Sequence, residues 1–363
     1  MATYEIWLTD ALGTTLDIID DWLSLSYTRA VNDIGGLELH LNGTYPLSNI
    51  KVDGRILVYR NGLLEIDAPW FVRKWEKQLS AEGVRTLAVY AVSANEILTR
   101  RIAYLQGDTS ETQISDYPDN MMKAIVRTQF FDSGNEYRDI SAYLSVEADA
   151  SLGSSFPKTF AWANVFDVLQ EITQSSIISG SAVYFDVVST TSSGLEFRTY
   201  PTLRGINHTF PGGINPVTLS PDYGNLSNVT SSFDRSQEIT SAIVASQGSG
   251  SARSVTQVGS TERKAESPFN LREIFVQANN TGEANLIETE GREALRAGRP
   301  LRTFNGELVN VPGACEYRVH WSLGDAVTVS FDGDSFDCTI DSISVSVSGG
   351  REEINGTLRV EED

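Results

Sequence analysis

Two stretches of the chain, residues 55–92 and residues 325–360, repeat one pattern of strands and tight turns. In both, alternating apolar and polar residues are interrupted by turns, which fall at Asn61-Gly62, Gly83, Asp332-Gly333 and Gly349-Gly350. Asn-Gly and Asp-Gly dipeptides favour hairpins, and regularly spaced strands with tight turns are typical of small barrels. Because a repeated unit constrains an architecture more than composition does, we expect two related β-barrels.

The middle of the chain has a helical rather than a strand periodicity. Asp116 and Pro118 are helix-start signals, and apolar residues follow them at helical spacing. A second apolar stripe consists of Trp162, Val165, Phe166, Leu169 and Ile172. Strands at residues 182–188 and 195–200 complete this segment. The sequence therefore predicts a mainly β fold with an α+β insert.

These patterns divide the chain into three expected domains. Residues 1–104 form the first barrel, residues 105–224 the α+β insert, and residues 225–363 the second barrel with one helix, which Thr281 would cap. Residues 248–251 read Gly-Ser-Gly-Ser, which predicts a flexible tip. A chain of 363 residues is long enough for separate cores, since single cores stop growing at about 250–300 residues.

The formal charge of −20 argues against broad contact with a nucleic-acid backbone, which proteins hold with Lys and Arg. A negatively charged wall instead repels phosphates, so DNA can pass along it without binding. Oligomers are usually symmetric, and a trimer of two-barrel chains would present six similar barrels. Such a ring fits a six-fold tube on one side and three-fold partners on the other. Charge and repeat together favour a homotrimer around a channel.

Three further features of the sequence indicate the cellular compartment in which the protein is made. No apolar run approaches the roughly 20 residues of a membrane-spanning helix, so we expect no stable membrane insertion. The start, Met-Ala-Thr-Tyr-Glu, lacks the basic and apolar regions of a signal peptide, which predicts assembly in the cytoplasm. Two cysteines, Cys315 and Cys338, are too few for a disulfide framework.

Six segments spread over most of the chain carry a family resemblance. They are residues 27–39, 58–62, 71–75, 98–104, 119–126 and 321–329. The first three resemble the N-terminal region of the hub and tail-tip proteins of siphophages, the next two resemble the same family, and the last is similar to the second barrel of such hubs. The resemblance implies the baseplate-hub fold, in which two barrels per subunit form a pseudo-hexameric ring as a homotrimer and the middle domain projects.

The same resemblance implies a role and partners. Family members are structural proteins of the virion, located at the tail tip and assembled in the host cytoplasm. They bind the tail tube or distal tail protein on one side and tip, fibre or receptor-binding proteins on the other. The tape measure protein is a further expected partner, and DNA passes through the lumen without specific binding. No enzymatic activity is expected.

The sequence shows no pattern of catalytic residues. The three histidines lack the spacing of metal ligands; they are His40, His208 and His320. Both cysteines fit structural positions better than nucleophilic ones. Asp332, Asp334 and Asp337 offer carboxylates to a hard cation, but their spacing departs from the calcium loop and Asp-Gly favours a hydrated hairpin turn. We expect no catalytic residue, cofactor or metal site. Whether a metal ion binds at Asp332, Asp334 and Asp337 stays open at this point.

The tryptophans allow a competing hypothesis. Most of the six fall on strand alternation or on the helical stripe, which favours core packing over sugar stacking. Trp70 and Trp75 flank one strand at opposite parity, so one of them should be exposed for subunit contact. Two other functions stay open. A carbohydrate- or receptor-binding tail protein would line a groove with aromatic residues, and a β-rich glycosidase would hold two carboxyl groups about 5 or 6.5–9.5 Å apart.

Overall fold

The computed structural model describes residues 2–65, 69–104, 112–131, 135, 137–190, 194–246, 253–278, 284–309, 311 and 313–360. The predicted tip at 248–251 and the predicted cap Thr281 lie outside these residues. The chain divides into two compact units, one formed by Met1–Val229 with Asn305–Asp363 and the other by Thr230–Phe304. In the described chain, no helix has the length and apolar character needed to cross a membrane.

A sheet of fifteen strands is the main element of the fold, and its longest path runs β18-β22-β25-β24-β3-β4-β8-β7-β5-β1-β2. The strands on this path are β1 Tyr4–Thr9, β2 Thr15–Ile19, β3 Ser24–Ala30, β4 Gly36–Asn42, β5 Arg55–Arg60, β7 Trp70–Leu79, β8 Arg85–Ser93, β18 Leu226–Asp234, β22 Leu301–Leu308, β24 Asp334–Ser348 and β25 Arg351–Val360. The remaining four are β6 Leu63–Leu64, β16 Asn207–His208, β17 Thr218–Leu219 and β23 Ala326–Phe331. Short 3₁₀ turns occur at Leu47–Asn49, Ala94–Arg100 and Pro221–Tyr223.

The expected mainly β architecture is confirmed. The long ladders are antiparallel, while β16 and β17 pair with β23 in the parallel sense. Among the described residues the path of strands stays open, because no ladder joins β2 to β18. The two closed barrels and the trimer therefore remain predictions.

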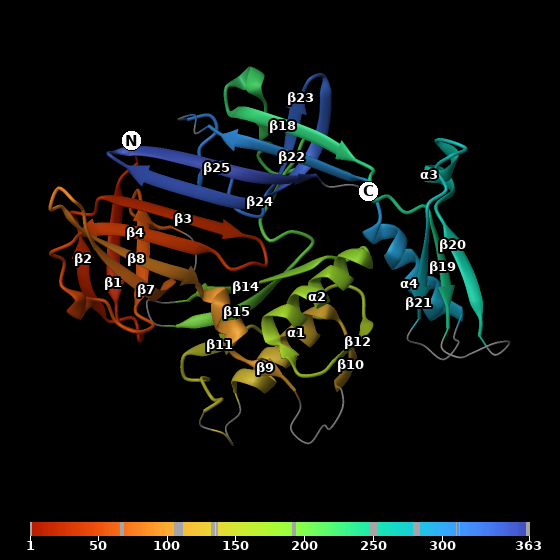
Figure 1. The fold of residues 1–363 in the computed structure, drawn as a ribbon, viewed down its shortest axis with the longest axis horizontal. Coiled ribbons are helices and arrows are strands. Elements are labelled where there is room, and N and C mark those ends of the chain that lie inside the picture. Colours follow the sequence, from red (N-terminus) through yellow and green to blue (C-terminus); the bar gives the residue numbers. More distant parts are fainter. Residues whose placement is uncertain are drawn as a thin grey trace. The chain divides into compact units, whose positions relative to one another are not determined.

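The two repeated stretches have matching turns and lie in one sheet. Both residues of the first turn have positive φ, 51° at Asn61 and 77° at Gly62, and the second has 54° at Asp332 and 88° at Gly333. Two positive φ values give the hairpin turn whose twist matches antiparallel strands. Strands β3 and β4 lie between the two stretches in this sheet: β24 of the second stretch pairs with β3, and β4 pairs with β8 of the first. Figure 1 shows the blue β24 beside the red β3.

The predicted insert packs two helices against a small sheet. Helices α1 (Pro118–Phe130) and α2 (Val165–Ile178) cover the sheet β11-β15-β14, formed by Leu144–Val146, Leu195–Pro201 and Val183–Ser189. Two further ladders pair β10 (Thr112–Asp116) with β12 (Phe156–Phe160) and β9 (Ile102–Ala103) with β13 (Ala163–Asn164). Phe130, Phe166 and Phe197 lie in the shared core. Both predicted helices are confirmed.

The second unit is a three-stranded sheet with a helix packed against it. Its order is β20 (Val255–Gly259), β19 (Ser241–Ala245), β21 (Glu273–Gln277), and α4 (Ala284–Ala297) packs on the sheet through Ile287 and Leu295. The short α3 (Thr261–Ala265) follows β20. Because β19 and β21 run parallel, the chain must cross over between them, which a simple meander does not require.

Candidate assembly surface

One face of the large sheet is lined with hydroxyl groups. Along β24 the residues at even positions from 342 to 348 are all serines, whereas the apolar residues between them are buried. Strand β3 repeats this alternation, and three of the four serines lie opposite its polar residues. The paired positions are Ser342 with Ala30, Ser344 with Thr28, Ser346 with Ser26, and Ser348 with Ser24.

The polar rows continue across six neighbouring strands. Side chains of directly paired residues point to the same face of a sheet, so the ladder registers trace each row. One row runs from β25 to β7 through Glu353, Ser346, Ser26, Glu38, Tyr90 and Lys74. Because β7 and β8 come from the first repeated stretch and β24 and β25 from the second, both stretches build this polar face. The alternating serines at 342–348 are the sequence signal from which this face could have been predicted.

Charges on the polar face occur in pairs. Lys74 lies 2.6 Å from Glu76, and Arg351 lies 3.0 Å from Glu353. A hydrogen bond and the charge of Lys74 lower the pKa of Glu76. Solvent screens these exposed pairs, so they add little stability. The pairing has a larger effect on the binding of anions. Lys74 and Arg351 already contact Glu76 and Glu353, so neither is free to hold a phosphate.

A buried ion cluster fixes the first repeated stretch to the second. The Nε and Nη2 atoms of Arg60 donate to Glu352 Oε1 and Oε2 at 2.8 and 3.0 Å. Tyr4 donates its hydroxyl to the same carboxylate, and Arg60 also donates to the carbonyl of Tyr317 at 3.2 Å. Burial and the nearby Glu352 raise the pKa of Tyr4, so it stays a hydroxyl donor.

A second buried cluster connects the sheet to the insert. Asp186 of β14 accepts hydrogen bonds from Arg29 of β3 at 2.5 Å and from Arg204 at 2.9 Å. Burial acts to raise the pKa of Asp186, but the charges of the two arginines outweigh it and hold that pKa below its usual value. A buried carboxylate is stable only when it is paired in this way. The pairing therefore orients the insert on the sheet.

The sheet presents two open edges. In the described chain no strand pairs with the outer side of β2 or of β18. On β2 the side chains of Leu16 and Ile18 are exposed. Unpaired strand edges are sites of association with further chains, and a ring of subunits is one way of covering them.

The predicted candidate residues do not assemble into a catalytic or metal site. Within the described residues, no three His, Cys, Asp or Glu side chains gather as ligands would. His40 lies 2.7 Å from Glu38 on the polar face, His208 lies 3.7 Å from Asp325, and His320 accepts a hydrogen bond from the backbone of Glu316. Cys315 and Cys338 are buried free thiols, as expected for structural positions.

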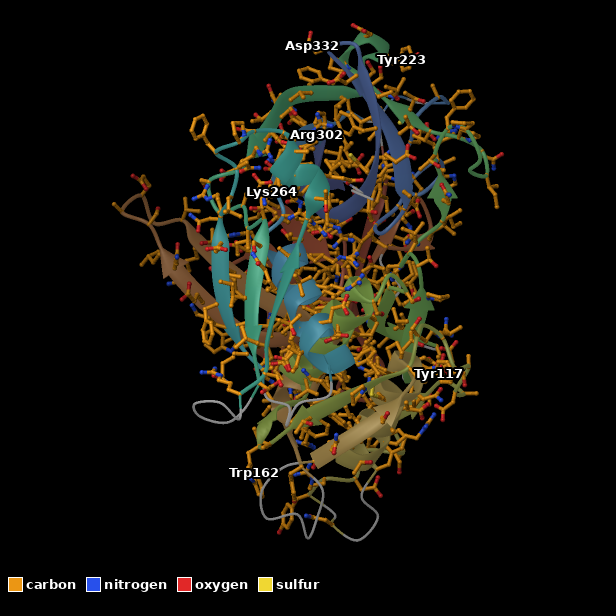
Figure 2. The ribbon with its side chains drawn as sticks, turned by 90° about the vertical axis from the view of Figure 1, so that its right-hand side faces the viewer. Tyr117, Trp162, Tyr223, Lys264, Arg302 and Asp332 are labelled. Carbon is orange, nitrogen blue, oxygen red and sulfur yellow. The ribbon has the colours of Figure 1, made fainter. Side chains whose placement is uncertain are left out.

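The three aspartates of the second turn belong to a hairpin. Asp332 lies at the tip of the β23–β24 hairpin, and Figure 2 shows it at the margin of the ribbon. Asp337 points from β24 toward β23, where it accepts a hydrogen bond from Thr328 at 2.8 Å. The predicted hairpin turn is thus confirmed.

The tryptophans differ from their predictions in two ways. Trp70 is 1% and Trp75 47% exposed, as predicted, but a bulge between Val72 and Lys74 puts both rings on the same face. Trp75 is exposed although Val89, its partner on β8, is fully buried. The prediction that Trp162 packs in the core is wrong: α2 begins only at Val165, and Trp162 is 57% exposed on the preceding turn (Figure 2).

Comparisons with known proteins agree on one kind of molecule. A family model described as Siphovirus ReqiPepy6 Gp37-like protein matches residues 3–358. No curated protein matches the sequence.

Three solved structures are similar over nearly the whole of both chains. They are a 43 kDa tail protein of prophage MuSo2 from Shewanella oneidensis (14% identity, TM-score 0.59, covering 98% of each chain), a tail protein from Neisseria meningitidis (11%, 0.58, 99% of this chain and 97% of that one) and the prophage tail protein gp18 from Listeria monocytogenes (11%, 0.56, 98% and 94%). At such low identity the likeness concerns the fold.

Proposed function

The chain belongs to the Siphovirus ReqiPepy6 Gp37-like protein family, and we propose that it is a structural protein of a phage tail that forms a trimeric hub at the tail tip. The similar structures are described as tail proteins, and their fold matches this chain from end to end. The hub would join the six-fold tail tube or distal tail protein to three-fold tip, fibre or receptor-binding proteins. The tape measure protein is a further proposed partner.

The observation that carries this proposal is the polar face built jointly by the two repeated stretches. In the proposed ring, residues 1–104 and 225–363 supply the two similar hub domains, and residues 105–224 project from the ring. Three copies then present six related surfaces. The open edges at β2 and β18 support association into such a ring, because strand edges that stay unpaired promote aggregation.

The polar face also suits passage of DNA. Serine and threonine hydroxyls offer no positive charge, and Lys74 and Arg351 are paired with Glu76 and Glu353. Affinity for a nucleic-acid backbone comes from cations that neutralise phosphates. A lumen lined by this face would let DNA slide without binding. We expect no catalysis in this role.

The first test is the mass of the purified protein by light scattering, combined with negative-stain images of the same sample. We expect a three-fold ring with a central hole, alone or after addition of the tail tube protein. A compact monomer under both conditions would contradict the trimeric hub.

A second test concerns the lumen. Ser26→Arg with Ser346→Arg, built into phage particles, places two cations on the proposed channel wall. We expect particles that assemble but release DNA more slowly, with the delay shrinking as salt rises. Ser48→Arg, at an exposed serine outside the polar face, is the matched control. Equal release rates for both variants would exclude this face from the channel.

A further inference from the structure

The small sheet of the second unit ends in an open edge, the outer side of β21. Within the described chain, β21 pairs with β19 and with no strand on its other side. Edge strands in natural proteins are commonly blunted by proline, lysine or a bulge. Strand β21 reads Glu-Ile-Phe-Val-Gln, its register with β19 is regular, and it has none of these three devices. Its edge is therefore able to accept a further strand.

The hydrogen bonds to β19 decide which backbone groups of β21 face outward. The carbonyl of Arg272 accepts from the N–H of Ser241, and the N–H of Ala278 donates to the carbonyl of Ala245. In a parallel ladder, residues that bond to the neighbouring strand alternate with residues that do not. The odd-numbered residues of 273–277 therefore direct both their N–H and their C=O groups to the open side.

The side chains of the same residues stand on the face of the sheet that α4 does not cover. Side chains alternate between the two faces of a strand, and Ile274 and Val276 belong to the core shared with α4. Phe275 lies between them in sequence, points to the opposite face and is 59% exposed. The open edge thus carries an exposed aromatic ring at its centre.

The two ends of the edge carry opposite charges. Gln257 donates to the carboxylate of Glu273 at 3.4 Å, and no Lys or Arg, all of which the structure describes, lies within ion-pair distance of it. At the other end, the guanidinium of Arg253 donates to the side chain of Gln277 and lies 5.3 Å from the centroid of the Phe275 ring. From one end to the other, the edge is acidic, aromatic and basic.

This order is complementary to itself when a second copy approaches in the opposite direction. A two-fold axis beside Phe275 sets the two β21 strands antiparallel, with Phe275 opposite its counterpart and Glu273 opposite Gln277 of the second copy. Every outward N–H then meets an outward C=O, and Glu273 of each copy comes beside Arg253 of the other. We propose that two copies of the chain pair through β21 in this register, so that their small sheets become one continuous sheet.

The charge of the second unit permits such an approach. Residues 230–304 contain nine acidic and nine basic residues, so the formal charge of −20 lies wholly outside this unit. Two copies therefore meet here without the repulsion that opposes contact between the acidic parts of the chain. A single strand of five residues covers less than the about 800 Å² per partner of a standard interface. We therefore expect a dimer that dissociates on dilution and at high salt.

Sedimentation velocity of the full chain over a hundredfold range of concentration tests the pairing, which does not rest on the hub role. We expect a species that gives way to half its mass on dilution. Glu273→Arg sets two positive charges against each other at both ends of the contact, and should weaken association by roughly tenfold or more. Arg253→Glu should weaken it in the same way through two negative charges. The double variant exchanges the charges and should restore association.

A control variant separates this contact from net charge. Glu262→Arg makes the same change of charge as Glu273→Arg at an exposed position of α3, away from the edge of β21, and should associate like the wild type. Restoration in the double variant also separates a contact from a folding defect, because two defects in folding would add.

Cysteine cross-linking tests the register. Residues that exchange hydrogen bonds in an antiparallel pair have Cα atoms about 5.5 Å apart, within the range that a disulfide bridges. Phe275→Cys should therefore give a disulfide-linked dimer on oxidation. Val255→Cys, at a similarly exposed position on β20, should not. The native thiols of Cys315 and Cys338 are buried.

The outcomes distinguish this pairing from the proposed ring. A mass that Glu273→Arg leaves unchanged, a double variant that stays dissociated, or equal cross-linking of both cysteine variants would overturn the pairing. A trimer of the same mass in the wild type and in Glu273→Arg would overturn it and leave the hub intact. A dimer that Glu273→Arg abolishes, without any trimer, would support the pairing and contradict the hub.

Discussion

Arg60 of β5 and Glu352 of β25 form a two-point ion pair, although 292 residues separate them. Only 6% of the Arg60 side chain and 12% of the Glu352 side chain are exposed. The pair joins the two repeated stretches beneath the polar face.

Glu352→Gln should lower the free energy of unfolding by about 3 kcal/mol, because it removes the carboxylate that pairs with the buried Arg60 cation. Urea denaturation measures this value. Glu353→Gln changes the next residue, whose pair with Arg351 is exposed, and should cost less than about 0.5 kcal/mol. Equal effects of the two substitutions would show that burial of the pair is unimportant.

The same pair predicts a loss of stability in acid. Burial acts to raise the pKa of Glu352, but hydrogen bonds from Arg60 and Tyr4 outweigh it and hold this pKa below its ordinary 4.5. A carboxyl group with a depressed pKa stabilises the fold above its unfolded pKa and stops doing so as pH falls through its folded pKa. The difference in unfolding free energy between wild type and Glu352→Gln should have its full size at pH 7. It should disappear as pH falls below 4.5.

Glu65 should behave in the opposite way. It is 2% exposed, its Oε1 atom has no hydrogen-bond partner in the described structure, and burial raises its pKa. A raised carboxyl pKa contributes stability at low pH that is lost as pH rises through the folded value. Glu65→Gln should therefore stabilise the protein at pH 8, with the gain shrinking toward pH 4.5. Glu5→Gln, at an exposed carboxylate, is the control; a loss of stability at pH 8 in Glu65→Gln would refute this reading.

In the insert, Lys123→Met should cost about 3 kcal/mol. Lys123 and Asp119 are fully buried on α1 with Nζ 2.6 Å from Oδ1, so removing the ammonium leaves a buried carboxylate without this counter-charge. Arg292→Met breaks a pair with the same i,i+4 spacing on α4, but there both side chains are exposed, and about 0.5 kcal/mol is expected. Thermal and urea unfolding would both reveal whether the costs differ.

Gly333→Ala tests the second hairpin turn. A Cβ at Gly333 meets no atom within 4 Å, so the cost of about 1–2 kcal/mol comes from its φ of 88° alone. A Cβ at Gly36 also meets no atom within 4 Å, and the φ of Gly36 lies outside the left-handed region. Gly36→Ala should therefore be neutral or stabilise the protein by up to about 1 kcal/mol. Unchanged stability of Gly333→Ala would mean that the turn changes conformation at little cost.

Local patterns in the sequence predicted local structure well. The Asn61-Gly62 and Asp332-Gly333 turns and the α1 and α2 helices follow from short-range chemistry, because φ preferences and periodicity act within a few residues. Trp162 was misplaced because its spacing fits the α2 stripe, while the helix begins three residues later. Caps and turns, rather than periodicity, decide such boundaries.

Long-range contacts could not be predicted in the same way. Nothing near Arg60 in the sequence indicates Glu352, and nothing near Arg29 indicates Asp186, because these pairs depend on how separate strands meet. The sequence also does not indicate the bulge that places Trp70 and Trp75 on one face. One inserted residue moves every later side chain of the strand to the opposite face of the sheet.

The pairing of β24 with β3 has a consequence for biosynthesis. Arg29 is made early, but its strand partner Ile343 leaves the ribosome more than three hundred residues later. At about 5–20 residues per second, the edge of β3 waits roughly 15–60 s for its neighbour. During that interval the nascent chain exposes a strand that other chains could pair with. In a cell making many copies at once, translation speed and chaperone protection of this edge would therefore influence how many chains reach the native sheet.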